Sequence, residues 1–448
     1  MNFLVPELIR KKRDGGEFSS DEIHFLVRGF SSGTIADYQI SAWLMATYFK
    51  GLSADEIYAL TEAMKNSGEC LVWPKNSERP LADKHSTGGV GDKVSLILAP
   101  LATCLGMRVP MMSGRGLGFT GGTLDKLQSI PGFNIFCSHA EMLANLESVG
   151  ALLMAQSANL VPADKKLYSL RDVTGTVEEL GLITGSIVSK KWAAGVEHIV
   201  YDVKCGSGAF MPDLASATKL AQSLVRVSKL AKMNASALIT RMEEPLGAFV
   251  GNSLEVLESY SILKNEFPTP QHRTMALSLS DLCCTLVAEM AVLSKTRSNF
   301  EAAKGECHRH IESGAALAAF EKLLRAQGAS ARWKEDLPRA SKIMELKSPR
   351  SGTLARVNGR SLGILGLQMG VGRAKSEDKI DPSLGFEILA RPGQRLAQGQ
   401  TLGFLHTREG LPNLEIMASF ELAFSFSEEM PANESEAFSD SSILGRVN

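Results

Sequence analysis

The stretch that decides the fold runs from Lys84 to Gln128 and reads KHSTGGVGDKVSLILAPLATCLGMRVPMMSGRGLGFTGGTLDKLQ. It holds two glycine-rich segments, 84–92 and 113–123, and between them the apolar run 94–105, which is long enough for one buried helix. Glycines let main-chain N–H groups turn toward an anion without a side chain in the way. Helix N-termini add positive potential at the same place. The local chemistry therefore predicts a site for phosphate or another small oxyanion.

The two segments match neither of the common nucleotide-binding fingerprints. A Walker loop needs Gly, four residues, Gly, Lys and then Ser or Thr, and neither segment has that spacing. Gly114, Gly116 and Gly121 do not fit the dinucleotide-binding spacing either. A pair of tight turns beside a buried helix is the competing interpretation of this stretch.

Several long motifs resemble the thymidine and pyrimidine-nucleoside phosphorylase family. KHSTGGVGD and SGRGLGFTGGTLDKL carry the resemblance within the stretch quoted above. Outside it, the segments that look like this family are LIRKKRDG near the start, VPADKKLYSLRDVT at 161–174, ITGSIVSKK at 183–191, DVKCGSGAFM at 202–211, PLGAFVGNSLEV at 245–256 and GVGRAKSEDKIDPSLGF at 370–386. The likeness covers roughly residues 1–410, and agreement over so many separate segments is not expected by chance.

Composition bounds the class of protein. With 448 residues, 44% of them hydrophobic, the chain can bury a large core in two or three domains. A net charge of −1 gives no electrostatic reason to expect nucleic acid or an anionic membrane as partner. Seven cysteines without a Cys-x-x-Cys motif favour free thiols in a reducing compartment. Early charges and the lack of a long apolar run argue against a signal peptide or a membrane span, so we expect a cytoplasmic protein.

The chain begins with a helical pattern over residues 1–66. Ser19 with Glu22, and Ser53 with Glu56, have the capping-box spacing, and each pair is followed by apolar residues at helical intervals. This pattern predicts a small all-helical lobe.

An α/β lobe follows, over 80–163 and 196–340. Short apolar runs at 109–112, 151–155 and 199–203 alternate with helical patterns, which predicts a mostly parallel or mixed central sheet. Ligands bind at the carboxyl ends of such strands, where both glycine segments would lie.

The remaining chain changes character twice. Residues 213–340 look helical throughout. Residues 345–425 carry frequent glycines between short apolar runs, which predicts a strand-rich α+β appendage. Residues 427–448 contain few apolar side chains, so we expect a flexible tail.

The family resemblance implies that residues 164–195 return to the helical lobe. The subunit would then have two lobes and a cleft, with the glycine segments on one wall and Arg171, Ser186 and Lys190 on the other. Ser186 and Lys190 are four residues apart and share a helix face. The resemblance also implies a homodimer that pairs through the helical lobe.

The resemblance further implies reversible phosphorolysis of a pyrimidine nucleoside, in which phosphate displaces the base at the sugar C1. Negative charge then moves into the pyrimidine and positive charge builds on the sugar, so fixed cations beside the base favour the transition state. The residues implied for catalysis and pyrimidine binding are His85, Arg171, Ser186 and Lys190. The residues implied for phosphate are Lys84, Ser86, Ser95, Ser113 and Thr123. Taken singly, each has a plainer interpretation as a loop residue, surface ion pair, solvated helix face or helix cap.

The chain departs from the family at a few positions. Phe119 stands where members usually carry His, in a loop expected to fold over the cleft, and Gln128 replaces the usual Glu. Because Phe cannot hydrogen-bond across closing loops, we expect a less firmly held lid. The family's broader branch binds potassium near Gly91, Lys93 and Leu246. Since the Lys93 ammonium could take the place of that ion, neither a metal nor an organic cofactor is predicted.

Three functional interpretations stay open. The first is an active phosphorylase of this family. Met111 favours the branch that acts on thymidine over the broader branch that also uses uridine. A catalytically weakened homologue that still binds pyrimidines is the non-enzymatic alternative. A phosphoribosyltransferase of related fold would need an acidic, magnesium-binding motif, which the sequence does not convincingly offer.

Overall fold

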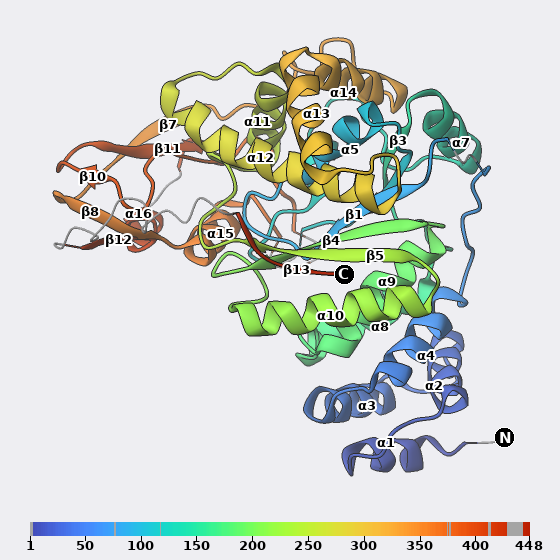
Figure 1. Ribbon diagram of the computed structural model, residues 1–448. Coiled ribbons are helices and arrows are strands. Elements are labelled where there is room, and N and C mark those ends of the chain that lie inside the picture. The colour runs from blue at the N-terminus through green and yellow to red at the C-terminus, as the bar shows by residue number, and fades with distance from the viewer. Residues whose placement is uncertain are drawn as a thin grey trace.

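The computed structural model describes residues 3–75, 78–116, 118–373, 375, 378–410, 414–427 and 442–448. Figure 1 shows a helical lobe at the bottom, an α/β domain above it and a strand-rich domain at the left. The chain is an α/β protein of two lobes with a C-terminal appendage, in agreement with the predicted fold class.

The helical lobe begins with four short helices: α1 (Val5–Arg13), α2 (Ser20–Ser32), α3 (Asp37–Lys50) and α4 (Ala54–Lys65). Both predicted capping boxes are present, at Ser19 with Glu22 and at Ser53 with Glu56, where each side chain bonds the other residue's main-chain N–H. These caps satisfy N–H groups that a helix start leaves unpaired, and they fix where α2 and α4 begin.

Two later helices, α8 (Pro162–Thr174) and α9 (Leu180–Ala193), pack against α2, α3 and α4, where the resemblance places them. Gly185 lies at the closest approach of α9 to α4. A Cβ atom there would lie 3.0 Å from the Met64 Cε and 3.4 Å from the Leu60 Cδ2. Glycine at position 185 lets α9 pack closely against α4, which offsets the cost of about 1 kcal/mol that glycine has in helix preference.

The α/β domain is built on one twisted layer of strands. The main sheet has the order β1-β4-β5-β13, and β2 pairs with β3 in a second parallel ladder. A bridge between Leu81 and Arg108 brings β2 alongside β1. The strands are β1 (Ala82–Ser86), β2 (Val109–Ser113), β3 (Ala151–Ala155), β4 (His198–Cys205), β5 (Asn234–Arg241) and β13 (Ile443–Val447). The strands predicted at 109–112, 151–155 and 199–203 are thereby confirmed.

Helices cover both faces of this sheet. Helix α10 (Leu214–Leu230) lies between the sheet and the helical lobe, and α5 and α12–α14 lie on the other face (Figure 1). The further helices of this domain are α5 (Val94–Cys104), α6 (Thr123–Gln128), α7 (His139–Ser148), α11 (Asn252–Lys264), α12 (Pro270–Leu293), α13 (Phe300–Glu312) and α14 (Ala315–Ala326).

The expectation that residues 213–340 are helical throughout is wrong at β5, which pairs with β4 in parallel register. Its sequence, NASALITR, contains Ala and Leu, which also favour helices. Six of its eight residues are buried, because helices cover both faces, so no polar–apolar alternation marks it as a strand.

Among the residues that the structure describes, one helix is long and apolar enough to cross a membrane. It is α12, with 24 residues, and 72% of its most apolar window is buried inside the protein. The sequence analysis expected no such run. Its packing against α5 and α13 is that of a core helix.

The C-terminal domain is strand-rich, as predicted. Its elements are β7 (Lys342–Lys347), β8 (Gly352–Val357), α15 (Gly359–Met369), β9 (Gly385–Ile388), β10 (Arg395–Leu396), β11 (Thr401–Thr407), α16 (Leu414–Leu422) and β12 (Phe424–Ser427). They form the sheets β10-β8-β12 and β6-β9-β11-β7. Since β6 (Phe249–Val250) comes from the α/β domain, the second sheet joins the two domains.

The predicted flexible tail over 427–448 is wrong at its end. Residues 443–447 form β13, which pairs antiparallel with β5, and Arg446 makes an ion pair of 2.7 Å with the buried Glu289 of α12. An uncovered edge strand and a buried carboxylate both need a partner, and this short segment supplies both. Residues 428–441 lie outside the described residues.

Candidate active site

The first glycine segment follows β1, at the carboxyl edge of the sheet. Lys84 is buried, and its Nζ donates to the Ser95 Oγ at 3.0 Å, in the first turn of α5. The Ser86 Oγ donates to the Asp92 Oδ2 and accepts from the Gly88 N–H at 3.1 Å. Three residues predicted to bind phosphate, Lys84, Ser86 and Ser95, therefore lie around the turn that joins β1 to α5.

A buried charge network supports this turn from below. Burial would raise the pKa of Asp92, but Lys204 and Lys84 outweigh it and hold that pKa well below its usual range, so the carboxylate is ionised. Lys204 also pairs with Asp202 at 2.7 Å, and Asp202 accepts from the Thr240 Oγ1 at 2.6 Å. Because these charged side chains are already paired with one another, they hold the turn in one shape.

The second glycine segment joins β2 to α6. Ser113 ends β2 and Thr123 begins α6. The segment doubles back on itself, since a Cβ atom on Gly122 would lie 1.9 Å from the Gly116 N atom. The Gly116 N–H donates to the Asp125 Oδ2 at 2.7 Å. Ser113 and Thr123 therefore stand at the two ends of one tight loop.

The opposite wall is formed by α8 and α9. The Lys190 Nζ lies 2.9 Å from the Ser186 Oγ and 2.6 Å from the Asp164 Oδ2. The predicted pairing of Ser186 with Lys190 on one helix face is therefore present. Asp164, on α8, was not predicted. It holds the ammonium group in place and leaves it partly exposed.

Arg171 lies in the last turn of α8, beside the connection to α9. Its guanidinium donates to the main-chain oxygens of Thr176, Val177 and Leu182. Burial lowers its pKa, and the nearby Asp164 opposes that effect. Arg171 is thus buried at one end of the wall, near the same carboxylate that holds Lys190, with its donors directed to the main chain.

Lys191 ties the two walls together. Its Nζ lies 2.6 Å from the Asp83 Oδ2 on β1 and 2.9 Å from the Met112 oxygen on β2. The sequence allowed Lys190 and Lys191 to be a solvated helix face, yet Lys191 is buried. Adjacent lysines therefore take different directions, Lys190 toward Asp164 on α8 and Lys191 toward the sheet.

His85 lies where the walls meet. Burial in the cleft, together with the charges of Lys191, Lys190 and Lys84, lowers the pKa of His85 well below its usual value. The imidazole is consequently neutral near pH 7, with one nitrogen donating and the other accepting. It is suited to hydrogen-bond a base carbonyl, and less suited to supply a proton.

Phe119 and Gln128, the two positions at which the sequence departs from the family, each contact other side chains. The Phe119 ring lies 5.6 Å from the Phe210 ring, centroid to centroid, and the Arg360 guanidinium lies 4.7 Å from the Phe119 ring centroid. Gln128 accepts a hydrogen bond from Arg115. Phe119 therefore has the apolar neighbour that a ring in this loop needs.

Lys93 occupies the place where the sequence analysis considered a potassium ion. Its Nζ donates to the main-chain oxygens of Leu246 and Phe249 and pairs with Glu258 at 2.8 Å. Carbonyl and carboxylate oxygens also suit an alkali cation, so the residues present fit the ammonium group directly. Over the described part of the chain, no group of three or more His, Cys, Asp or Glu side chains could hold a metal ion.

The residues that sequence reasoning missed are mostly carboxylates: Asp83, Asp92, Asp164 and Asp202. Asp83 pairs with Lys191, Asp164 with Lys190 and Asp202 with Lys204, while Asp92 lies near the charges of Lys204 and Lys84. Of the three ion-paired carboxylates, Asp202 alone stands near its own partner in the chain, as Asp202-x-Lys204. That adjacency within a buried strand was the signal that could have found it, because buried lysines need a counter-charge.

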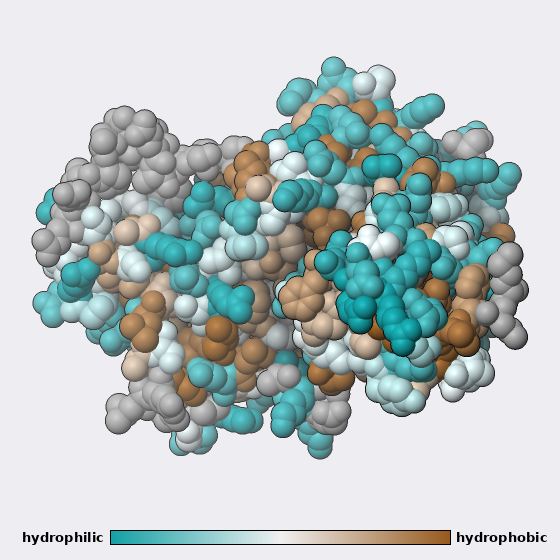
Figure 2. All heavy atoms as spheres, turned by 90° about the horizontal axis from the view of Figure 1, so that it is seen from below, coloured by the Kyte–Doolittle hydropathy of each residue, from teal (hydrophilic) through white to brown (hydrophobic). Residues whose placement is uncertain are grey.

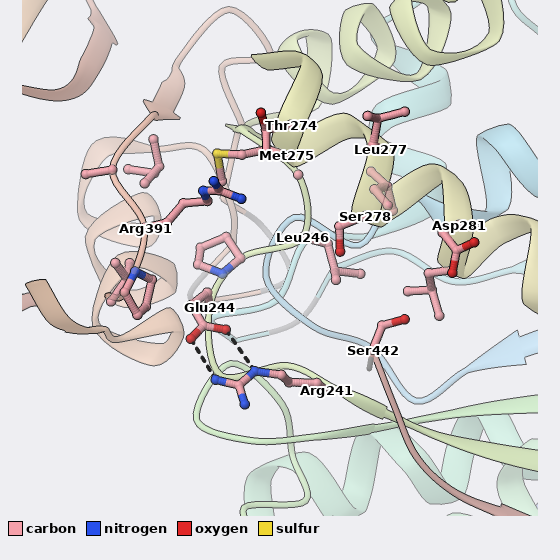
Figure 3. A pocket seen from close by; sticks show the side chains of 18 residues that line it. Arg241, Glu244, Leu246, Thr274, Met275, Leu277, Ser278, Asp281, Arg391 and Ser442 are labelled. Carbon is pink, nitrogen blue, oxygen red and sulfur yellow. Dashed lines mark hydrogen bonds and ion pairs between the residues drawn. The ribbon is translucent and has the colours of Figure 1, made fainter. Parts of the chain in front are cut away.

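A separate cavity of about 500 Å³ lies between the α/β and C-terminal domains (Figure 3). Its lining is largely apolar, and Arg241 at its rim is paired with Glu244 at 3.0 Å. None of the predicted site residues lines it. The predicted site residues therefore lie apart from this cavity, around α9 and the ends of β1 and β2.

The two-lobed fold and the family models that match it define a glycosyltransferase. Residues 78–317 match the model of the glycosyl transferase family a/b domain, and residues 6–68 match its helical bundle domain. Residues 353–425 match the pyrimidine nucleoside phosphorylase C-terminal domain. The structure of an anthranilate phosphoribosyltransferase from Thermus thermophilus has the same fold, with a TM-score of 0.56 at 17% identity over 71% of this chain and 98% of that one.

Relatives that match nearly the full length of this chain show which family of glycosyltransferases it belongs to. A thymidine phosphorylase of Sinorhizobium fredii is 41% identical over 97% of this chain and 98% of its own length. One from Burkholderia cenocepacia is 42% identical over 91% and 92%, respectively. A pyrimidine-nucleoside phosphorylase of Geobacillus stearothermophilus is 41% identical over 88% and 90%. The chain belongs to the thymidine and pyrimidine-nucleoside phosphorylase family.

Proposed function

We propose that this enzyme is a thymidine phosphorylase, which converts thymidine and phosphate reversibly into thymine and 2-deoxy-α-D-ribose 1-phosphate. The observation that carries the proposal is that Lys190 and Lys84, from two different parts of the chain, both lie close enough to His85 to lower its pKa, while Lys190 contacts Ser186. Relatives of that name match nearly the whole chain.

On the base side, Lys190 has the central role. Its ammonium is held by Asp164 yet partly exposed, so it can stabilise negative charge that develops on the pyrimidine as the glycosidic bond breaks. Ser186 adds a hydroxyl at the ring edge. Neutral His85 donates or accepts a hydrogen bond at a base carbonyl. Arg171 lies at the end of this wall. We propose that its guanidinium turns some of its donors from main-chain oxygens to an oxygen of the bound pyrimidine.

On the phosphate side, Lys84, Ser86, Ser95, Ser113 and Thr123 supply the donors. The ionised Asp92 fixes the first turn but also repels an anion, so the positive charge of Lys84 and the N–H groups of both turns must outweigh it. Phosphate bound there faces C1 from the side opposite the base. Its charge also stabilises the cationic sugar of the transition state.

The direct test is incubation of the enzyme with thymidine and phosphate, with chromatographic detection of free thymine. We expect thymine to form only when phosphate is present and Lys190→Ala to abolish most of it. Thymidine binding without phosphate-dependent thymine release would instead identify a weakened, pyrimidine-binding homologue.

The second candidate is a broader pyrimidine-nucleoside phosphorylase. The similarity to the enzyme from Geobacillus stearothermophilus supports it. Assaying uridine beside thymidine separates the two. A kcat/KM for uridine within about tenfold of that for thymidine, or about 1.4 kcal/mol, would favour the broader activity.

We further propose that the enzyme is a cytoplasmic homodimer that pairs through its helical lobe. Helix α3 carries exposed apolar side chains at spacings that share one face: Tyr38 is 77% exposed and Phe49 75%, and Met45 and Tyr48 lie between them in the sequence. Figure 2, seen from the helical-lobe side, has hydrophobic groups among the hydrophilic ones on this face. A Tyr38→Glu, Phe49→Glu double variant should run as a monomer in light scattering, whereas the parent chain should run as a dimer.

A further inference from the structure

The second glycine segment needs support from outside itself. Ser113 and Thr123 stand at its ends, and between them are five glycines: Gly114, Gly116, Gly118, Gly121 and Gly122. Glycine loses more backbone freedom than any other residue when it is ordered. A loop of this composition holds its ends in register only if tertiary contacts fix its middle.

The first such contact comes from α15 of the C-terminal domain. The Arg360 guanidinium lies 4.7 Å from the Phe119 ring centroid, and Phe210 packs beside that ring. The approach of α15 to the loop is close, since a Cβ atom on Gly363 would lie 2.4 Å from the Phe119 oxygen. A cation over an aromatic face is attracted by the ring's quadrupole, so Arg360 holds Phe119 in one orientation.

The second contact comes from the segment just after α15. The Arg373 Nη1 lies 2.6 Å from the Asp125 Oδ1, and both side chains are mostly buried. The other oxygen of Asp125 accepts the Gly116 N–H at 2.7 Å. Arg373 therefore fixes the carboxylate that in turn fixes the main chain of the loop.

The same helix also contacts the loop after β4. A Cβ atom on Gly359 would lie 2.9 Å from the Gly208 Cα. The Gly208 oxygen accepts the Val90 N–H at 3.2 Å, and Val90 belongs to the first glycine segment. Helix α15 thus reaches the second glycine segment directly and the first through Gly208.

We propose that the C-terminal domain is a working part of the phosphate site, in which Arg360 and Arg373 are positioning residues that hold the second glycine segment in its anion-binding shape. Neither arginine needs to touch phosphate, because each acts through a residue of the loop, Phe119 or Asp125. The ligand class, phosphate, rests on the proposed function. The loop-positioning role does not.

Hydrogen exchange tests the positioning role without reference to activity. In Arg360→Ala and in Arg373→Ala, amides of residues 113–123 should exchange at least about tenfold faster than in the parent chain, while amides of β4 and β5 stay unchanged. Arg395→Ala, an exposed arginine on β10, is the matched control and should leave the loop unchanged. Unchanged exchange in both loop variants would overturn the proposal.

Steady-state kinetics tests the link to phosphate. Arg360→Ala should raise the apparent KM for phosphate about threefold to tenfold, and Arg373→Ala about tenfold to a hundredfold, because it removes a charge-assisted contact. The KM for thymidine should stay within about twofold in both, a split that general loss of structure would not produce. Faster loop exchange with an unchanged KM for phosphate would refute the assignment to phosphate. Absence of thymine release by the parent chain would refute the proposed function but leave the exchange result standing.

Discussion

The two walls of the cleft are held in different ways. On the phosphate wall the predicted residues bind one another or residues close to them in the chain, as Lys84 binds Ser95 and Ser86 binds Asp92. On the base wall the predicted cations bind carboxylate or main-chain groups outside the predicted set, as Lys190 binds Asp164 and Arg171 binds the α8–α9 connection. The first turn of the phosphate wall is thus tied mainly to its own neighbours and its second glycine segment to the C-terminal domain, whereas the base wall is assembled from two helices.

The difference indicates which substitutions should affect each wall. The first phosphate turn is fixed by contacts with Ser95 and Asp92 and by buried charges, so single changes in it should act mainly on phosphate binding. The base wall depends on the position of α9, which packs against α4 and α10 and is linked to β1 and β2 by Lys191. The following predictions test that division.

The largest effect is expected where the walls meet. Lys191→Ala leaves the fully buried Asp83 without its counter-charge, so the free energy of unfolding should fall by about 3–5 kcal/mol, measured by urea denaturation. The double variant Lys191→Met, Asp83→Asn removes both charges and should recover most of that loss. A loss below about 1 kcal/mol for Lys191→Ala would mean that another group holds α9.

The next effect concerns turnover on the base wall. Lys190→Ala should lower kcat/KM for thymidine by about 2–4 kcal/mol, since a charge-assisted contact that strengthens in the transition state is lost. Lys165→Ala, an exposed lysine on α8, serves as the control and should not change kcat/KM. Near-normal turnover by Lys190→Ala would show that the leaving base is stabilised elsewhere.

A smaller effect is expected on the phosphate wall. Lys84→Ala or Ser113→Ala should raise the apparent KM for phosphate about tenfold, or about 1.4 kcal/mol, with the KM for thymidine nearly unchanged. Initial rates at varied phosphate and fixed thymidine measure this. If both substrates' KM values rose together, the two walls would not be separable in the way described above.

The smallest effect is a dependence of stability on pH. His85 has a lowered pKa in the fold, so below about pH 6.5 the unfolded chain binds a proton that the folded chain does not, and stability falls as the pH falls. One such group contributes at most about 1.4 kcal/mol per pH unit. Urea denaturation between pH 5 and 7 should give a shallower slope for His85→Gln than for the parent chain. Identical slopes would show that His85 does not titrate differently in the two states.

Much of this division was predictable from particular residues. The capping boxes at Ser19 and Ser53 located two helices, and the apolar runs located three strands, because these signals are local. The spacing of Ser186 and Lys190 predicted their shared face for the same reason. The family motifs supplied the opposing walls, which no local pattern could.

Other features were not predictable, because they depend on what surrounds a residue. Lys191, beside Lys190, could be part of a solvated helix face by sequence, yet it is buried with a carboxylate. Strand β5 reads as helix because both its faces are covered. Strand β13 has only five residues, ILGRV, after a polar stretch of sequence, and the open edge of β5 gives it its place.

That last strand has a consequence for how the chain is made. The edge of β5 is covered by β13, and the whole C-terminal domain lies between them in the sequence. During synthesis, the α/β sheet therefore emerges with one hydrogen-bonding edge open, and it stays open until residues 443–447 leave the ribosome. An open edge can pair with a neighbouring chain on the same messenger, which is a route to aggregation. We expect the interval between completion of β5 and arrival of β13 to be the period in which newly made chains most need a chaperone.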